Sequence, residues 1–377
     1  MASRNLVLLG VGHTNAHVVK EWRKNPITDC SLTCISQFST ATYSGMLPGT
    51  LGHQYRDDEM QIDLQSLCEQ AGARLIIADT NGLDLNSRAV LFADHDSIPF
   101  DALSIGVGSV PAGYEACASA KSVVPTKPMQ TFSQRWQQRL HDVGDSKNRV
   151  SDIVIVGGGV ASVEIACCLQ QQCRRLNDGQ QPALSIFTRG SKLASDMTSR
   201  SVKKIERLLM RKGIDVHYGS HVTEIGEGCV VTADGRRHPA DAVVWATGAA
   251  AAPVLEKLDL RTDERGFIAT SNTLQSFSDE RIFAVGDAGT IVASPSAKAG
   301  VYAVRQCPVL WQNLRAVLDG GPLATFEPQS DFLKLLNTGD GKALLQYGRI
   351  SVHAGWCWHL KTWIDRRFVS AFQRSSE

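Results

Sequence analysis

The chain has 377 residues, of which 43% are hydrophobic and 20% charged, a composition typical of a globular protein long enough for two domains. Its 39 basic and 38 acidic residues nearly cancel, so neither nucleic acid nor an acidic polymer is indicated as a partner. No apolar run is long enough to cross a bilayer, and charges at Arg4 and over 21–24 argue against a secretory signal, so we expect a cytoplasmic protein.

Apolar runs bounded by turn residues predict a first group of strands, over 5–10, 31–36, 74–78, 88–92 and 101–107. Helical patterns lie between them over 14–24 and 60–71. A connector rich in turn residues follows and contains Pro111, Pro125 and Pro128.

A second group of strands is predicted over 152–157, 183–188, 214–218, 229–232, 241–246 and 281–287. The helices of this part are predicted over 160–175, 198–212 and 298–318. Such alternation is typical of parallel sheets, so the predicted fold class is α/β with two Rossmann-like dinucleotide-binding domains. A small α+β region should end the chain, with strands and then one helix over 331–336, 343–347, 350–353 and 358–372.

The first group of strands contains the signature of a dinucleotide-binding turn, Gly10-x-Gly12, between a strand and a helix. The first glycine permits a tight turn, the second lets the backbone approach a pyrophosphate, and the helix N-terminus offers amide donors to that anion. Asn15 stands in place of the third glycine. The next strand ends at Ser36 and Gln37, which can hydrogen-bond a ribose but carry no charge.

The second group repeats this arrangement at Gly157-x-Gly159, with Ser162 in place of the third glycine. Its second strand ends at Thr188 and Arg189 where an acid is usual. A carboxylate there accepts hydrogen bonds from a ribose 2′-hydroxyl and repels a 2′-phosphate, whereas an arginine does the reverse. NADPH is therefore at least as well indicated as NADH, unless Arg189 is simply a solvated charge.

Two further strands end in turns of small residues, over 102–111 and 242–253, where backbone can pack close to a cofactor. Asp287 ends another strand in "IFAVGDAGT", where its carboxylate can accept hydrogen bonds from a sugar-alcohol chain such as ribityl. Each of these features is common alone. Two glycine motifs followed by small-residue turns and then by this aspartate form a more specific pattern of a dinucleotide-binding protein.

Over roughly residues 5–320 the motifs "GVGHTN", "IGVGS", "VGGGVASVE", "WATG" and "FAVGDAG" resemble those of the pyridine nucleotide-disulfide oxidoreductase superfamily. The resemblance implies that the first motif holds FAD and the second holds NADH or NADPH. Both are needed because a hydride passes from one cofactor to the other. The glutathione reductase branch has a C-x4-C pair in the stretch that corresponds to 40–52, which has no cysteine here.

That stretch is instead similar to type II NADH dehydrogenases and sulfide:quinone reductases. The resemblance implies that Glu164 lies near the contact of nicotinamide and flavin, where it could accept a hydrogen bond or relay a proton. A glutamate in the first turns of a helix is also favoured by the helix dipole alone. The glutamine pair that type II NADH dehydrogenases carry near the quinone is Arg305-Gln306 here, which leaves the acceptor open.

A fuller resemblance, over nearly the whole chain, is to the flavoprotein module fused ahead of selenide, water dikinase, although these 377 residues contain no kinase domain. It rests on 43–49, 127–136, 300–310, 332–348 and 363–368. We divide the chain into an FAD-binding domain (1–113 and 271–325), an NAD(P)-binding domain (114–270) and a C-terminal interface or membrane-contact region (326–377).

Glu164 is the expected catalytic residue, and no metal site is expected. His13 either touches a phosphate or points to solvent. The residues expected to bind FAD and the nicotinamide nucleotide are Gly10, Gly12, His13, Thr14, Asn15, Ser36, Gln37, Thr42, Thr80, Gly108, Ser109, Gly286, Asp287, Ala299, Gly300, Gly157, Gly159, Val160, Ala161, Arg189, Thr247 and Gly248.

The predicted last helix combines aromatic and basic residues: Trp356, Trp358, Lys361, Trp363, Arg366, Arg367, Phe368, Phe372 and Arg374. Such a helix suits a peripheral contact with the inner face of the cell membrane, a cover over the flavin, or a homodimer interface.

The function that we predict is an FAD-dependent NAD(P)H dehydrogenase for electron transport to a quinone or other small acceptor. One alternative is a sulfur or selenium oxidoreductase using Cys167, Cys168, Cys307 or Cys357. Another is a non-catalytic flavin redox partner of a selenophosphate-synthesising enzyme, and a third is a scaffold that has lost one nucleotide site.

Overall fold

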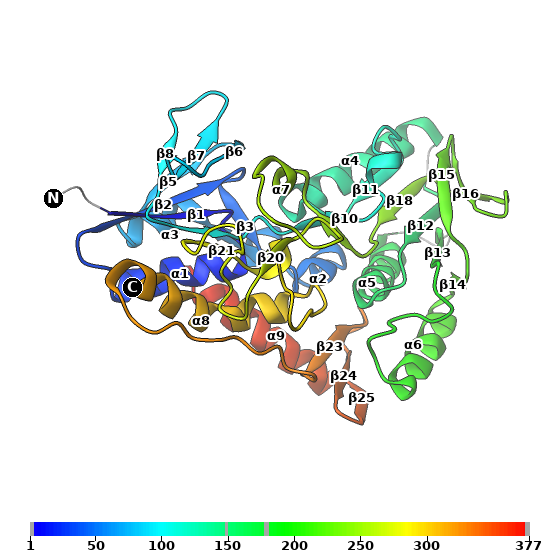
Figure 1. Cartoon of the computed structure of the whole chain (residues 1–377). Coiled ribbons are helices and arrows are strands. Elements are labelled where there is room, and N and C mark those ends of the chain that lie inside the picture. The colour runs from blue at the N-terminus through cyan, green and yellow to red at the C-terminus, as the bar shows by residue number, and fades with distance from the viewer. Residues whose placement is uncertain (1–3, 148–149, 177–180, 374–377) are drawn as a thin grey trace.

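The computed structural model of the chain describes residues 4–147, 150–176 and 181–373. Two five-stranded sheets lie side by side, one built mainly from the N-terminal part and one from the middle of the chain (Figure 1). Every strand pairing within these two sheets is parallel. The predicted α/β class with parallel sheets is confirmed.

The first sheet has the order β21-β9-β1-β2-β5. Its strands, in that order, are Ile282–Ala284, Ala102–Ile105, Arg4–Leu9, Cys30–Ser36 and Arg74–Ile77. The last four residues of the central strand β1, Leu6–Leu9, are apolar and buried, as is typical of a central strand in a parallel sheet. Helices α1 (His13–Lys24) and α8 (Gly300–Asp319) pack against each other beside this sheet, and α3 (Leu64–Gln70) contacts α1.

The second sheet has the order β11-β18-β12-β13-β14. Its strands, in that order, are Val123–Pro125, Ala242–Trp245, Asp152–Val156, Ala183–Phe187 and Ile214–His217. It is accompanied by α4 (Phe132–Lys147), α5 (Val160–Leu176) and α6 (Ser199–Lys212). Helix α6 begins where the Thr198 hydroxyl accepts a hydrogen bond from the Ser201 amide, and ends at Gly213, whose φ of 69° is easiest for glycine.

A short antiparallel ladder joins the two units: β10 (Ser109–Pro111) pairs with β19 (Ala249–Ala251). The carbonyl oxygen of Ala112 accepts hydrogen bonds from the Thr247 hydroxyl at 2.7 Å and the Trp245 indole at 3.0 Å. These bonds hold the residue that follows β10 against the end of β18 and the turn after it.

Smaller elements surround the two sheets. The strands are β3 (Thr40–Thr42), β4 (Gln61–Asp63), β6 (Thr80–Asp84), β7 (Ala89–Phe92), β8 (Ile98–Pro99), β15 (Val222–Gly226), β16 (Cys229–Thr232), β17 (Arg237–Pro239), β20 (Ile268–Thr270) and β22 (Gly289–Ile291). The short helices are α2 (Leu47–Leu51) and α7 (Pro253–Lys257), with single 3₁₀ turns at Asp57–Met60, Glu115–Cys117, Met129–Thr131 and Gly286–Ala288. The tail forms a sheet of β23 (Lys334–Asn337), β24 (Ala343–Tyr347) and β25 (Ile350–Ala354), followed by α9 (Gly355–Ser370), which packs against this sheet.

The structure corrects the expected elements in two places. Helix α4 was not expected, because three prolines suggested turns, yet Phe132, Trp136 and Val143 recur at helical spacing and are buried. The expected helix over 60–71 is instead strand β4 followed by α3, which the Asp63 carboxylate caps by accepting from the Ser66 amide. Arg374 lies outside the described residues.

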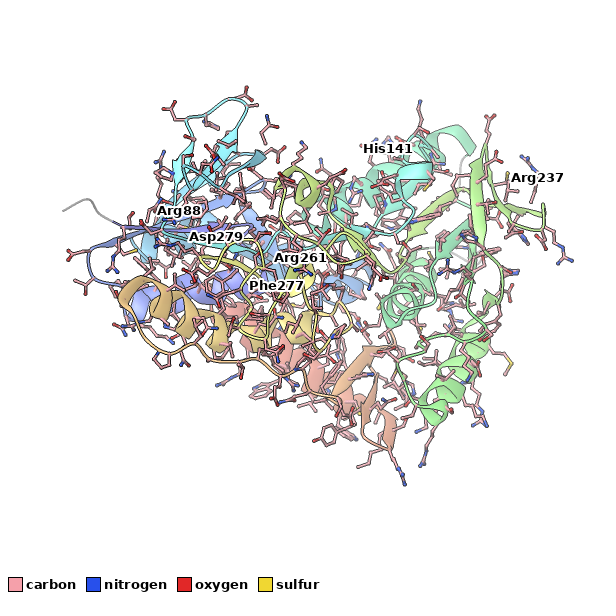
Figure 2. All side chains as sticks on the ribbon, viewed as in Figure 1. Arg88, His141, Arg237, Arg261, Phe277 and Asp279 are labelled. Atoms are coloured by element: carbon pink, nitrogen blue, oxygen red, sulfur yellow. The ribbon has the colours of Figure 1, made fainter. Side chains whose placement is uncertain are left out.

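Charged side chains extend into solvent from both units, for example Arg88 on the first and Arg237 on the second (Figure 2). Near the centre of that view the Arg261 guanidinium lies 5.3 Å from the ring centroid of exposed Phe277. Among the described residues we find no helix with both the length and the apolar character of a membrane span.

Candidate active site

The first glycine turn connects β1 to α1. Gly10 has a φ of 82°, and a Cβ built on it would lie 2.7 Å from the backbone of Val107, so glycine is required. Gly12 is the N-cap of α1, and a Cβ there would meet only the Gly106 carbonyl oxygen, at 3.3 Å, among the described atoms within 4 Å. The amides at the start of α1 therefore lie where a pyrophosphate could approach the backbone.

Asn15 maintains the close packing that the third glycine of the motif usually provides. Its Nδ2 donates to the carbonyl oxygens of Gly10 at 2.7 Å and Ser104 at 3.2 Å, and its Oδ1 accepts from the Ser104 hydroxyl at 2.7 Å. The side chain is fully buried, and these bonds satisfy most of its polar capacity. Asn15 thus acts as a structural link between α1 and its sheet.

The second glycine turn connects β12 to α5 in a similar way. Gly157 has a φ of 139°, and a Cβ there would lie 2.2 Å from the Ala246 carbonyl oxygen. The buried Ser162 hydroxyl donates to that same oxygen at 3.0 Å. No described atom lies within 4 Å of a Cβ built on Gly159, so the backbone there is open to a ligand.

The end of β13 brings a basic side chain beside the second turn. A Cβ on Gly158 would lie 2.2 Å from the Thr188 hydroxyl oxygen, so the strand end and the turn are in direct contact. Arg189 follows at once, is exposed, and makes no ion pair within the described part of the chain. Its guanidinium is available to an anion bound at the turn.

Asp287, Ser109 and Lys127 form a compact polar cluster between the two units. Asp287 Oδ2 accepts from the Ser109 hydroxyl at 2.7 Å and pairs with Lys127 Nζ at 2.9 Å, and Lys127 also donates to Ser109. Burial alone would raise the pKa of Asp287, but the Lys127 charge and these hydrogen bonds outweigh it and hold that pKa below its usual value. Lys127 was not predicted, since it comes from the connector.

The start of α8 closes this side of the candidate site. The Thr14 hydroxyl donates to the Ala303 carbonyl at 2.7 Å, and the Gly286 amide donates to Gln306 Oε1 at 2.7 Å. Gln306 occupies one of the two positions at which type II NADH dehydrogenases carry a glutamine pair. Here its side chain stabilises the turn before Asp287. The expected residues at the helix starts are Val160 and Ala161 on α5, and Ala299 and Gly300 on α8.

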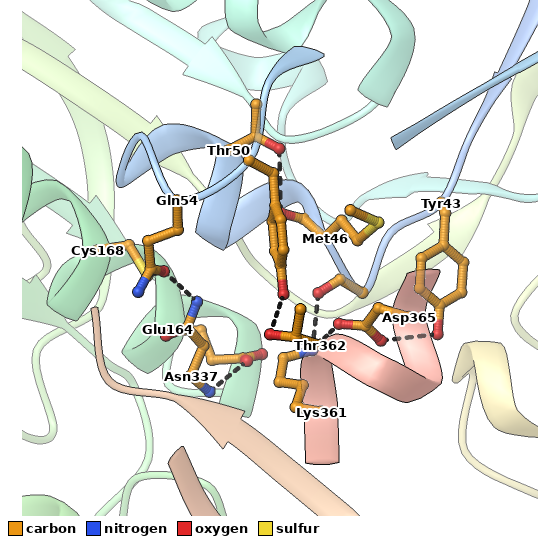
Figure 3. A network of polar contacts seen from close by, with 12 residues as sticks. Tyr43, Met46, Thr50, Gln54, Glu164, Cys168, Asn337, Lys361, Thr362 and Asp365 are labelled. Carbon is orange, nitrogen blue, oxygen red and sulfur yellow. Dashed lines mark hydrogen bonds and ion pairs between the residues drawn. The ribbon is translucent and has the colours of Figure 1, made fainter. Parts of the chain in front are cut away.

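Glu164 lies in the first turns of α5 and is partly buried. Its Oε1 accepts a 2.7 Å hydrogen bond from the Asn337 amide on β23 (Figure 3). Burial raises the pKa of Glu164 to about 7, although the Lys361 charge and the Asn337 amide each act to lower it. Such a carboxyl group can both hold and release a proton near neutral pH.

Lys361 and Asp365 of α9 extend the network on the other side (Figure 3). Lys361 Nζ donates to Asp365 Oδ2 at 2.9 Å and to the Gly45 carbonyl at 2.8 Å, and the Tyr43 hydroxyl donates to Asp365 Oδ1 at 3.2 Å. Burial alone would lower the pKa of Lys361, but Glu164 and Asp365 outweigh it and raise that pKa. Lys361 therefore stays charged. From the sequence it was expected only as one of the basic side chains of the last helix, whereas here it is buried beside Asp365, which the sequence patterns did not single out.

Helix α9 covers the first glycine turn with one side and is exposed on the other. The Phe368 ring stacks on Tyr43 with centroids 4.4 Å apart and lies 5.6 Å from His13. His13 therefore does not point to solvent, and burial lowers its pKa to about 4. Trp356 and Trp363 are 55% and 59% exposed, so the tail's aromatic residues are divided between a cover and an outer surface.

Some expected binding residues make only local contacts. The Ser36 hydroxyl bonds to Phe38 in its own turn, and Gln37 is exposed. The Thr80 hydroxyl donates to the Gly82 and Leu91 carbonyls of its own sheet. A Cβ on Gly108 or Gly248 would have no described atom within 4 Å, so both turns are open.

Two buried polar atoms support the fit of a dinucleotide at the first turn. His13 Nε2 and Thr42 Oγ1 are buried and have no hydrogen-bond partner among the described residues. Native proteins rarely leave such atoms unpaired, so a bound group with complementary polar atoms is expected beside them. Together with the open backbone at Gly12 and Gly159, the residues present fit FAD and a nicotinamide dinucleotide.

The ten cysteines are free thiols, and those of the sulfur alternative are poorly suited to react. Burial raises the pKa of Cys167 and Cys307 to about 12, and raises the pKa of Cys168 and Cys357 as well. Within the described residues no group of three or more His, Cys, Asp or Glu could hold a metal ion.

Comparison with known proteins places the chain in a family. Residues 4–308 match the family described as pyridine nucleotide-disulphide oxidoreductase. The chain belongs to this family. It is therefore an oxidoreductase, and its cofactors are FAD and a nicotinamide dinucleotide.

Several relatives are similar over most of this chain. The NADH dehydrogenase-like protein YutJ of Bacillus subtilis is 26% identical over 348 residues, or 90% of this chain and 91% of that protein. The type II NADH:quinone oxidoreductase of Haemophilus influenzae is 25% identical over 264 residues, or 61% of this chain and 59% of that protein. The NDH2 structure from Plasmodium falciparum with NADH shares the fold, with a TM-score of 0.83, 11% identity and coverage of 98% and 97%. The sulfide:quinone oxidoreductase of Aquifex aeolicus also shares it, with a TM-score of 0.81, 15% identity and coverage of 98% and 91%.

Proposed function

We propose that this chain oxidises NADPH or NADH and passes the electrons through FAD to a small acceptor of the quinone class. The observation that carries the proposal is Glu164, which lies on the helix that the second glycine turn opens and is bonded to β23 of the tail. The overall reaction balances as NAD(P)H + H⁺ + quinone giving NAD(P)⁺ + quinol. It needs a group that exchanges protons at neutral pH, and a carboxyl group with a pKa of about 7 meets that need.

Each cofactor is assigned to one turn. Gly10, Gly12 and the Asp287–Ser109 pair would hold FAD, with the carboxylate accepting from its ribityl hydroxyls. Gly157 and Gly159 would hold the nicotinamide dinucleotide. When bound, FAD supplies the two-electron chemistry, and the protein aligns it with the nicotinamide.

The domain boundaries given above, with FAD bound by 1–113 and 271–325 and the nucleotide by 114–270, are part of this proposal. Helix α9 would exclude water from the Glu164 network, because Lys361 and Asp365 are each at most 5% exposed. The buried, high-pKa thiols favour this route over the sulfur or selenium alternative.

We also propose that the outer side of α9 rests on the cytoplasmic membrane surface. Exposed Trp356 and Trp363 suit the headgroup region, and Arg367, whose guanidinium lies 5.5 Å from the Trp363 ring, suits anionic lipid. Binding to anionic vesicles should fall in the W356A/W363A double variant, and equal sedimentation of both proteins would refute the contact.

The direct test of the function is steady-state oxidation of NADPH with duroquinone as acceptor. Glu164→Gln should retain FAD but lose about a hundredfold in kcat, within the usual range for a proton-transfer group. Unchanged kcat in that variant would remove Glu164 from the mechanism.

A further inference from the structure

A second cavity, of about 400 Å³, opens between the loop after α2, the first turns of α4 and the second half of α5. Its volume is within the range of small-molecule sites in proteins. Nothing in the cofactor assignments above uses this cavity. Its wall includes Gln54, which belongs to the network in Figure 3, and Tyr55, whose hydroxyl meets that of Thr362.

Two side chains that line the cavity carry buried polar atoms without a hydrogen-bond partner in the described parts of the chain. They are Ser133 Oγ and Trp136 Nε1, one helical turn apart on α4. Trp136 is 2% exposed, and an indole N–H can only donate. Because a buried donor without a partner is costly, a ligand with acceptor oxygens would stabilise this arrangement.

The remaining lining favours a flat and uncharged ligand. Tyr55 and Trp136 supply aromatic rings, which pack well against planar molecules. The Arg56 charge is paired with Asp58, which does not line the cavity, at 2.7 Å, and Glu59 on the wall is paired with Arg366 at 2.8 Å. With Asp57 also on the wall, the cavity offers no net positive charge to an anion.

The cavity wall is bonded directly to the Glu164 network. Gln54 Oε1 accepts from Asn337 Nδ2 at 2.7 Å, and the backbone amide of the same Asn337 donates to Glu164. The Tyr55 hydroxyl meets the Thr362 hydroxyl at 3.0 Å, next to Lys361. Two residues, Gln54 and Asn337, therefore connect a ligand in the cavity to the Glu164 carboxyl group.

One edge of the cavity has an unusual backbone conformation. His53 has a φ of 54°, in the left-handed region, and its Nε2 lies 2.7 Å from Gln172 Nε2 in a hydrogen bond. Non-glycine residues in this region cost free energy and persist where surrounding contacts hold them, often at binding sites.

We propose that this cavity binds the electron acceptor as a small, neutral, planar molecule with carbonyl oxygens, of the benzoquinone class. Ser133 and Trp136 donate to its oxygens, and Tyr55 packs on its ring. This assignment rests on the proposed function, and it adds the place and the residues that select the acceptor. The acceptor takes up two electrons and two protons to become the hydroquinone, as NAD(P)H and one solvent proton supply them.

The test measures binding and the two half-reactions separately, with duroquinone as the probe. Calorimetry gives its dissociation constant for the oxidised holoprotein, and anaerobic stopped-flow gives flavin reduction by NADPH or NADH and reoxidation by duroquinone. The variants are Ser133→Ala, Trp136→Phe and the cavity-filling Ser133→Leu. Matched controls are Ser119→Ala on the exposed surface and Trp311→Phe on α8, neither of which lines the cavity.

The expected result is a dissociation constant raised about tenfold in Ser133→Ala and Trp136→Phe, no measurable binding in Ser133→Leu, and unchanged flavin reduction in all three. Wild-type affinity in Ser133→Ala and Ser133→Leu overturns the proposal, and these two variants decide it even if Trp136→Phe does not fold. The proposal is also overturned if NADPH reduces the flavin of the wild-type protein but duroquinone does not bind to that protein. Failure of both nucleotides to reduce the flavin is a distinct result that refutes the proposed function instead.

Discussion

The backbone amide of Asn337 donates a 2.7 Å hydrogen bond to the Glu164 carboxylate, 173 positions earlier in the chain. This bond joins α5 of the second unit to β23 of the tail. Glu164 is partly buried and has a pKa of about 7, because this amide and the Lys361 charge only partly offset the loss of solvent.

The first prediction is the pH dependence of acceptor reduction. If protonated Glu164 supplies a proton, reoxidation of the flavin by duroquinone should slow as pH rises through about 7, where the carboxyl group loses its proton. In Glu164→Gln this pH dependence should disappear. A wild-type profile that stays flat between about pH 6 and 8 would contradict the assignment.

The same carboxyl group should make stability depend on pH. Its pKa in the folded protein lies above the ordinary value of 4.5, so its contribution is complete below that pH and is lost as pH rises to about 7. Between these pH values the free energy of unfolding of wild type should fall by about 3 kcal/mol relative to Glu164→Gln. Urea denaturation at several pH values measures this difference, and parallel pH curves for the two proteins would exclude a raised pKa.

Arg189 should select the nicotinamide nucleotide. Reversing its charge in Arg189→Glu should lower kcat/KM for NADPH at least ~tenfold relative to NADH, because a carboxylate repels the 2′-phosphate and accepts from a 2′-hydroxyl. Arg237→Glu, an exposed charge reversal in the same unit, is the control. An unchanged ratio would show that Arg189 is only a solvated charge.

Lys127 should support FAD binding through Asp287. In Lys127→Met the partly buried Asp287 carboxylate loses its ion pair at 2.9 Å, so its pKa should rise and its hold on a ribityl chain should weaken. We expect the dissociation constant for FAD to rise at least ~tenfold, a change of about 1.4 kcal/mol. The exposed Lys121→Met serves as control, and equal FAD affinity in both variants would count against this role.

Gly10 and Gly72 offer a matched pair for the first turn. Both have positive φ, of 82° and 61°, but only at Gly10 would a Cβ meet backbone, at 2.7 Å. Gly72→Ala should cost about 1 kcal/mol of stability, whereas Gly10→Ala should cost several times more and release FAD. Thermal unfolding and flavin content measure both effects, and similar losses in the two variants would argue against a tight turn at Gly10.

The sequence predicted the parts of the site that depend on local pattern. Gly10, Gly157 and Asp287 are recognisable because a turn needs glycine at fixed spacing after a strand. The long-range contacts of Lys127 and Lys361 could not be found in this way, since Asp287 lies 160 residues from Lys127 and Gly45 lies 316 residues from Lys361, and only the tertiary fold brings them together.

Some local sequence patterns indicated the correct structure, but other residues nearby favoured a different prediction. Helix α4 has buried Phe132 and Trp136 at helical spacing, yet the nearby prolines favoured turns. The sequence shows that Asn15 stands in place of the third glycine, but not that its side chain maintains the contact between α1 and its sheet through three hydrogen bonds. A pattern of residue types does not report what a polar side chain bonds to.

The most direct test of the central claim is an anaerobic visible spectrum of the purified protein before and after addition of NADPH and then NADH. The account predicts flavin absorption bands that bleach within seconds, faster with NADPH if Arg189 binds a 2′-phosphate. Flavin bands that persist with both nucleotides would contradict the dehydrogenase function.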